Sequence, residues 1–277
     1  MNINEKTKNI NQKFGLSDIK SNFILKKIIN NVEKVITVKL INYNKKLQQR
    51  LNLTIDDYKQ IYTLYCSPIE IELKVIDDIS DEFINIREGD NKYFHIYFDD
   101  SNQEIKRNYL NENEKVKTIK ILIDYHIKSL KGLFANCIFV SSINFKKFTR
   151  INITDMSYMF FNCVSLKELK VFNFNTNNVI DMSYMFCQCR ILTEINLCNF
   201  NTDNLINTSF MFYECSSLKK LVFKKFNKDK VTNKNKMFDE CPSLDKSSLG
   251  LNPKKNKKYY FLNNPRHSFE FLITKID

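Results

Sequence analysis

The sequence predicts an α/β repeat protein, a solenoid in which short parallel strands alternate with short helices. Three observations predict it. The segment DMSYMFFNC at Asp155 returns as DMSYMFCQC at Asp181, and Asn207 and Asn233 continue the series at the same 26-residue spacing. Methionine, phenylalanine and cysteine recur with that period. Strand-like apolar segments lie between the copies. A fixed period of this size is typical of repeat architectures, in which each copy buries its apolar face against its neighbours.

Each repeat combines two hydrophobic spacings. After Asp155, the positions of Met156, Met159 and Phe160 match one face of a short helix, and Asp155 itself suits the N-cap. The segment LKELKVFNF at 166–174 follows with the apolar spacing of a short strand. Each repeat is therefore expected to contain a short parallel strand, a turn and a short helix. The apolar faces of the strand and of the helix can be buried only against a neighbouring repeat.

The pattern DMSxMFxxCxSLxxLxLxxFxTxxV fits 155–246 closely and 129–154 loosely. At these residues the sequence resembles the BspA-like leucine-rich repeats, a 26-residue type catalogued as a domain of unknown function in mycoplasmas, other bacteria and protists. The resemblance implies a right-handed leucine-rich-repeat solenoid. In bacterial members it also implies surface display and adhesion.

Five segments are expected along the chain. Residues 1–16 form a flexible N-terminus, and 17–64 are helical from their apolar spacing. Residues 65–128 form a small β-rich module that caps the solenoid, with 116–125 as the strand that joins it. The solenoid covers 129–246, and 247–277 form a C-terminal cap or tail.

Within the helical segment, the arrangement ILKKIINNV…LINYNKKLQ weakly resembles an F-box. That resemblance implies an Skp-type adaptor of ubiquitin ligases as a partner bound through 17–64. The usual Pro before the first helix and Trp after it are absent. A plain helical cap on the repeats is the alternative.

Five cysteines fall on the 26-residue period and predict a structural column of reduced thiols inside the repeats. Stacked side chains point in parallel, which suits disulfide geometry poorly. Zinc ligands converge on one ion in close pairs, whereas one cysteine per repeat spreads them apart, so neither a metal nor another cofactor is expected. These residues are Cys137, Cys163, Cys189, Cys215 and Cys241.

Charge and glycine content narrow the class of function. The net charge of +12 favours acidic partners, although lysine is spread along the whole chain in the manner of a compositional bias. The chain has 4 glycines, no two of them close together, so phosphate-binding loops are not expected. No apolar signal region or membrane span is visible, and a cytoplasmic location is expected.

We therefore expect a non-enzymatic protein–protein interaction scaffold, because no acid, base or nucleophile groups converge in the pattern. The alternatives are an F-box-like substrate adaptor and, from the resemblance, a cell-surface adhesion protein. Nucleic acid is not expected as a partner, since Glu168 and Glu194 interrupt the basic residues. The candidate partner-binding face consists of outward residues on successive strands: Glu168, Lys170, Phe172, Glu194, Asn196, Cys198, Lys220, Val222 and Lys224.

Overall fold

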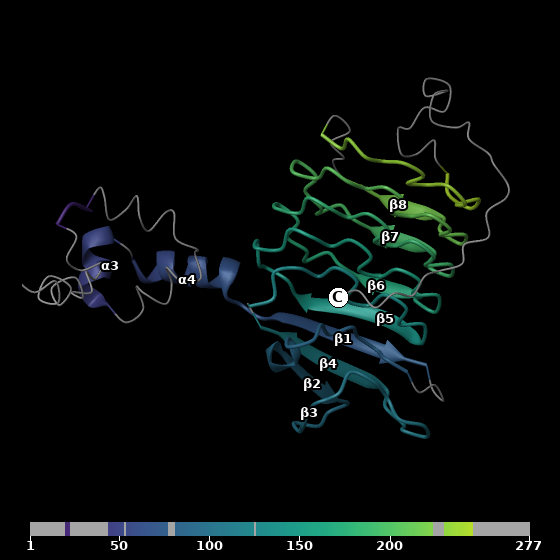
Figure 1. The fold of residues 1–277 in the computed structure, drawn as a ribbon, viewed down its shortest axis with the longest axis horizontal. Coiled ribbons are helices and arrows are strands. Elements are labelled where there is room, and N and C mark those ends of the chain that lie inside the picture. The colour runs from purple at the N-terminus through teal and green to yellow at the C-terminus, as the bar shows by residue number, and fades with distance from the viewer. Residues whose placement is uncertain are drawn as a thin grey trace, which may run out of the picture. The chain divides into compact units, whose positions relative to one another are not determined.

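The computed structural model describes residues 20–22, 44–52, 54–76, 81–124, 126–223 and 230–245 (Figure 1). This part of the chain is built mainly from β-strands and turns. The α-helices that lie wholly within it are short: α3 spans Lys45–Leu51 and α4 spans Ile55–Tyr65. A 3-10 turn, η3, covers Asn91–Tyr93.

Local side chains set where both helices begin. Asn44 Oδ1 accepts a hydrogen bond from Leu47 N at 3.1 Å before α3. Thr54 and Asp57 form a capping box before α4, in which each side chain accepts a hydrogen bond from the backbone N–H of the other residue. α3 ends at Asn52, which adopts the left-handed conformation with φ 54°. These ends follow ordinary capping chemistry.

Six strands form one mixed sheet in the order β3-β2-β4-β1-β5-β6. Neighbours pair antiparallel except β5 and β6, which are parallel. A second sheet pairs β7 with β8 in parallel. Parallel pairing therefore begins at β5, where the repeats begin. The strands are β1 (Ile69–Val75), β2 (Phe94–Phe98), β3 (Glu104–Ile105), β4 (Thr118–Ile123), β5 (Val140–Lys147), β6 (Glu168–Lys170), β7 (Glu194–Asn196) and β8 (Lys220–Val222).

The antiparallel strands bury every second side chain, as a sheet with one covered face should. In β1, Ile69, Ile71 and Leu73 are buried, and each pairs with a buried isoleucine of β4. Glu70 and Glu72 point to the other face and are half-exposed. One face of the sheet is thus core, and the opposite face carries charge.

The strand predicted at 116–125 exists as β4, but it does not join the repeats. β1 lies between β4 and β5 and pairs antiparallel with both. The prediction was wrong because β1 and β4 alternate apolar and polar residues in the same way. Their order in the sheet depends on long-range pairing, which alternation does not encode.

Consecutive repeats lie directly over one another, as the 26-residue period predicts. Isolated parallel bridges run in series through equivalent positions of five repeats. Between the bridges, every second N–H donates to the next repeat: Tyr158 N to Ser183 O and Phe160 N to Met185 O, both at 2.9 Å. Later repeats keep the same pattern. The bridged residues are Ser129, Asp155, Asp181, Asn207 and Asn233.

The segment predicted as a helix in each repeat is a series of turns. Tyr158 and Asn162 have left-handed backbones, with φ 58° and 55°, so the chain cannot continue as a helix through them. Such a conformation costs a residue other than glycine roughly 1–2 kcal/mol. Hydrogen bonds and packing between repeats outweigh that cost. The equivalent residues are also left-handed: Tyr184, Gln188, Phe210, Glu214, Lys236 and Glu240.

The predicted α/β class, a leucine-rich-repeat solenoid of short strands and short helices behind a helical N-terminal segment, is therefore wrong. The fold is mainly β-sheet, and its largest element is the six-stranded, mostly antiparallel sheet. Within the segment predicted as helical, 17–64, the described residues include the short α3 and most of α4, and 17–19, 23–43 and 53 lie outside the described residues. The predicted segments 1–16 and 247–277 also lie outside them.

A column of phenylalanine rings fills the interior of the repeats. Successive centroids lie 5.8, 5.5, 5.2 and 5.5 Å apart, with nearly parallel planes. Each ring is buried by the equivalent ring of the next repeat, and offset stacking of this kind adds to the burial of apolar area. The column contains Phe134, Phe160, Phe186, Phe212 and Phe238.

Candidate partner-binding face

The described residues of the predicted partner-binding face lie on β6, β7 and β8 or directly after these strands. Six of them are exposed, among them Phe172 at 54%, and Val222 and Cys198 are half-buried. Lys224 lies outside the described residues. We call this surface the strand face; its described residues are Glu168, Lys170, Phe172, Glu194, Asn196, Cys198, Lys220 and Val222.

Pairing between strands brings these residues into rows across the repeats. Glu194 is opposite Lys220, and Asn196 is opposite Val222, on the parallel pair β7 and β8. On β5 and β6, Ser142 is opposite Glu168. The columns that the period predicts are therefore present on each of these strand pairs.

Opposite charges balance one another on the strand face. Lys170 Nζ lies 2.8 Å from Glu168 Oε1, and Lys220 Nζ lies 3.5 Å from Glu194 Oε2. The hydrogen bond from Lys170 lowers the pKa of Glu168, and Ser142 Oγ donates to the same carboxylate at 3.3 Å. Pairs this exposed are worth about 0–1 kcal/mol each. Their effect is to leave the face with mixed and nearly cancelling charge.

The outer charged face extends beyond the repeats onto the antiparallel sheet. Lys146 of β5 pairs with Glu72 of β1 at 3.1 Å. Lys74 of β1 is opposite Ser142, and Glu72 is opposite Lys120 of β4. Sequence reasoning missed the residues of β1 and β4, because only the observed strand order places them beside the repeats. The polar residues of β1 and β4 alternate with buried isoleucines, which indicates that they face outward. The alternation does not indicate which strand lies next to them in the sheet.

The strand ladder is interrupted between β6 and β7, which belong to separate sheets. Leu169 at the centre of β6 is half-exposed, whereas the equivalent Ile195 and Leu221 are buried at 1% and 7% exposure. Phe172 follows β6 directly, and its carbonyl accepts a hydrogen bond from Asn199 Nδ2 at 2.7 Å. The interruption thus lies beside Phe172, which is the most exposed large apolar side chain among the described residues.

The cysteine column lies inside the repeats, where the sequence predicts it. All 8 cysteines of the chain are free thiols, and Cys163, Cys189 and Cys215 are 0% exposed. Each of these three donates from Sγ to a phenylalanine carbonyl of the preceding repeat at 3.0–3.1 Å. Burial raises the pKa of each thiol well above its ordinary value. Protonated, buried thiols fill space and are poor nucleophiles.

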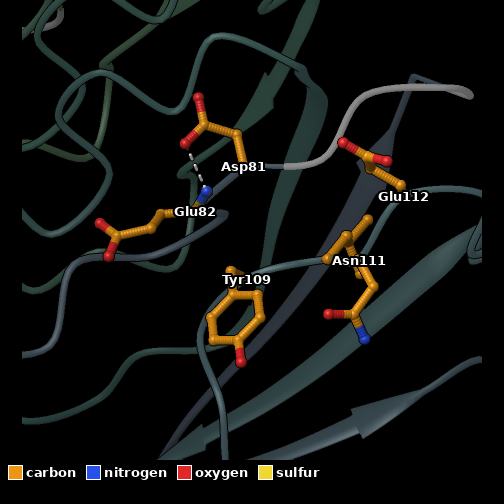
Figure 2. A pocket seen from close by; sticks show the side chains of 6 residues that line it. Asp81, Glu82, Tyr109, Asn111 and Glu112 are labelled. Atoms are coloured by element: carbon orange, nitrogen blue, oxygen red, sulfur yellow. Dashed lines mark hydrogen bonds between the residues drawn. The ribbon is translucent and has the colours of Figure 1, made fainter.

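An open depression is lined by residues that do not belong to the strand face, as Figure 2 shows. Glu82 N donates to Asp81 Oδ1 at 2.7 Å, so the Asp81 carboxylate is hydrogen-bonded to the backbone of the next residue. No group of three or more His, Cys, Asp or Glu side chains converges on a metal-sized site among the described residues. The depression is lined by Asp81, Glu82, Tyr109, Leu110, Asn111 and Glu112.

Within the part of the chain that the structure describes, no helix has the length and apolarity needed to cross a bilayer.

Matches to known proteins come from a protein-family model. A search of curated proteins and a search of solved structures each returned none. Residues 128–250, which contain the stacked repeats, match the model of the family described as "Mycoplasma protein of unknown function, DUF285".

Proposed function

We propose that the protein is a non-enzymatic interaction scaffold that binds a protein partner through the strand face. The observation that carries the proposal is Phe172, a residue that is 54% exposed on a surface whose other exposed residues are charged or polar. An aromatic side chain supplies a large apolar contact at little conformational cost, and such residues dominate binding energy at the centres of protein interfaces. The likeness to BspA-like repeats supports a binding role and names no partner.

The charges around Phe172 favour a protein over a polyanion. Glu168 and Glu194 are each paired with a lysine, so no unbroken basic track runs across β6, β7 and β8. A nucleic-acid surface neutralises many phosphates and needs such a track. A mixed polar rim around an apolar centre is the usual composition of a protein interface.

Affinity capture from native lysate with the full chain and two variants tests the proposal. Phe172→Asp places a charge at the proposed centre. Ile206→Asp is the matched control, since Ile206 is 48% exposed and lies outside the strand face. The proteins retained by the wild type should be lost with Phe172→Asp and kept with Ile206→Asp. Equal retention by both variants, at equal thermal stability, would contradict a binding role for the strand face.

A further inference from the structure

Arg150 is a fully buried arginine at the start of the repeats. Its exposed fraction is 0%. Nη1 donates to the carbonyl oxygens of Asp124 at 2.9 Å and Ile127 at 3.2 Å. Nε and Nη2 are buried and have no hydrogen-bond partner among the described residues. Three N–H hydrogens of a buried cation therefore lack an acceptor among the described residues.

The repeat pattern does not require an arginine here. The equivalent positions in the next two repeats hold Thr176 and Thr202, both buried. Thr176 Oγ1 donates to Asn201 O at 3.0 Å and accepts from Asn201 N at 2.7 Å. The buried threonine hydroxyl therefore has both a donor and an acceptor as partners. Arg150 replaces a small, satisfied side chain with a large, partly unsatisfied one.

The surroundings of Arg150 supply little negative charge. Burial lowers the pKa of Arg150 to about 10, while the Asp124 carboxylate acts in the opposite direction. The guanidinium therefore stays protonated at neutral pH. Asp124 Oδ1 lies 3.2 Å from His126 Nδ1 and is already engaged there. A buried charge without a close counter-charge costs several kcal/mol, so a folded protein normally provides one.

We propose that Arg150 Nε and Nη2 bind a small monovalent anion of the size of chloride. One negative charge compensates one guanidinium. A dianion would be repelled by Asp124 and would cost more to bring out of water. The complete burial of Arg150 also excludes a large organic acid. Arg150 is the only residue assigned to the site.

Asn152 lies two residues further on and is not counted as a ligand. Its side-chain polar atoms are also buried without a partner among the described residues. In the following repeats, however, Asn178 and Asn204 each donate from Nδ2 to the carbonyl 27 residues earlier, at 2.7 Å. For Asn152 that carbonyl belongs to residue 125, which lies outside the described residues.

Anion binding should stabilise the junction where the repeats start. Thr149 Oγ1 donates to Thr63 O at 3.0 Å, and Ile151 N donates to Leu64 O at 2.9 Å. Arg150 itself holds the carbonyls at the end of β4. The residues on either side of Arg150 thus tie the end of α4 to the first repeat, and Arg150 ties β4 to the same point.

The test is thermal unfolding of the full chain in sodium chloride and in sodium gluconate at equal ionic strength. Gluconate is too large for a fully buried site. The Tm of the wild type should be about 2–4 °C higher in chloride, because a ligand that binds only the folded state stabilises it. Arg150→Met keeps the length of the side chain without its charge and should remove that difference. Lys120→Met, which removes an exposed lysine of β4, should keep it.

A crystal of the wild type grown in bromide provides a second measurement if Arg150→Met does not fold. An anomalous peak in hydrogen-bonding contact with Nε and Nη2 is expected. The proposal is overturned if the wild-type Tm is the same in both salts, since water would then satisfy the guanidinium. It is also overturned if Arg150→Met keeps the full chloride effect, or if bromide gives no peak at Arg150.

Discussion

The ring of Phe160 lies parallel to the ring of Phe186, with 5.5 Å between the centroids and 8° between the planes. Both side chains are 0% exposed. They are 26 positions apart in the chain and occupy the same place in consecutive repeats. The period of the sequence is therefore the distance along the chain between neighbours in the core, and each repeat depends on the next to bury its own ring.

Phe186→Ala should destabilise the protein by about 3–5 kcal/mol, because it removes a ring from the middle of the column and leaves a cavity. Phe186 stacks on Phe160 at 5.5 Å and on Phe212 at 5.2 Å. Urea denaturation measures the change. Phe172→Ala is the control and should cost less than about 0.5 kcal/mol, since its ring is largely exposed. Similar losses for the two variants would show that the column does not form.

Replacing Asp181 by asparagine should cost less stability than replacing it by alanine. Asp181 Oδ1 accepts from Ser183 N at 2.7 Å and from Ser183 Oγ at 2.6 Å, which closes the first turn of the repeat. Asn207 holds the same two bonds to Ser209 with its amide oxygen. Asn207 Nδ2 also donates to Asp181 Oδ2 at 3.0 Å. Asp181→Asn keeps both bonds to Ser183 but loses this one and should cost about 1 kcal/mol, whereas Asp181→Ala loses all three and should cost about 2–3 kcal/mol. Equal losses for the asparagine and alanine variants would contradict this reading of the turn.

Cys198 should be the fast-reacting thiol of the native protein. It is half-buried, while the other cysteines are buried. Burial raises the pKa of Cys187 to about 12 and raises that of Cys137 further. Since the thiolate is the reactive form, a disulfide reagent at neutral pH should titrate one thiol quickly and the remaining ones only after denaturation. Cys198→Ser should abolish the fast phase; its persistence would mean that the cysteine column is open to solvent.

Glu114 should make stability depend on pH in the acidic range. The hydrogen bond from Arg107 Nη2 lowers the pKa of Glu114 below its ordinary value of 4.5, and the N–H of Asn111 adds to the effect. Because the pKa is lower in the folded state, the contribution is full above about pH 4.5 and is lost as the pH falls through the folded value. Glu114→Gln should therefore be less stable than the wild type at neutral pH.

The two proteins should converge in acid, since protonation of Glu114 removes the same interaction. Unfolding in urea at a series of pH values measures both curves. If the difference between wild type and Glu114→Gln stays constant from neutral pH to the acid limit, Arg107 does not hold the carboxylate in its charged form.

The sequence was sufficient to predict which residues lie over one another. The spacing of Cys163, Cys189 and Cys215 predicts an internal column, and the structure places all three at 0% exposure with equivalent hydrogen bonds. Periodicity encodes this relationship directly, because every copy must present the same apolar positions to its neighbours.

The type of secondary structure could not be predicted in the same way. The spacing of Met156, Met159 and Phe160 fits one face of a helix. A series of turns, in which the chain changes direction every few residues, buries the same three side chains. The difference lies in the left-handed backbones of Tyr158 and Asn162. A tyrosine at positive φ is contrary to local preference, and only hydrogen bonding to the next repeat makes it favourable. A local rule therefore gave the wrong element.

The candidate site was predicted only in part. Alternation identified Glu168, Lys170 and Phe172 as outward residues, and the structure exposes all three. The extension of the charged face onto Glu72 and Lys74 of β1 depends on which strands pair across long stretches of chain, which no local pattern specifies. The burial of Arg150 could not be predicted from the sequence, since a single arginine in a basic sequence is expected to lie on the surface.

Nuclear Overhauser contacts of the Phe160 amide proton test the stacking of the repeats most directly. The structure pairs Phe160 N with Met185 O at 2.9 Å, so contacts from this amide to residues 185 and 186 are expected. A helix through Asp155–Cys163 would instead give contacts from the Phe160 amide only to residues within about four positions along the chain. That result would contradict both the stacked repeats and the strand face built on them.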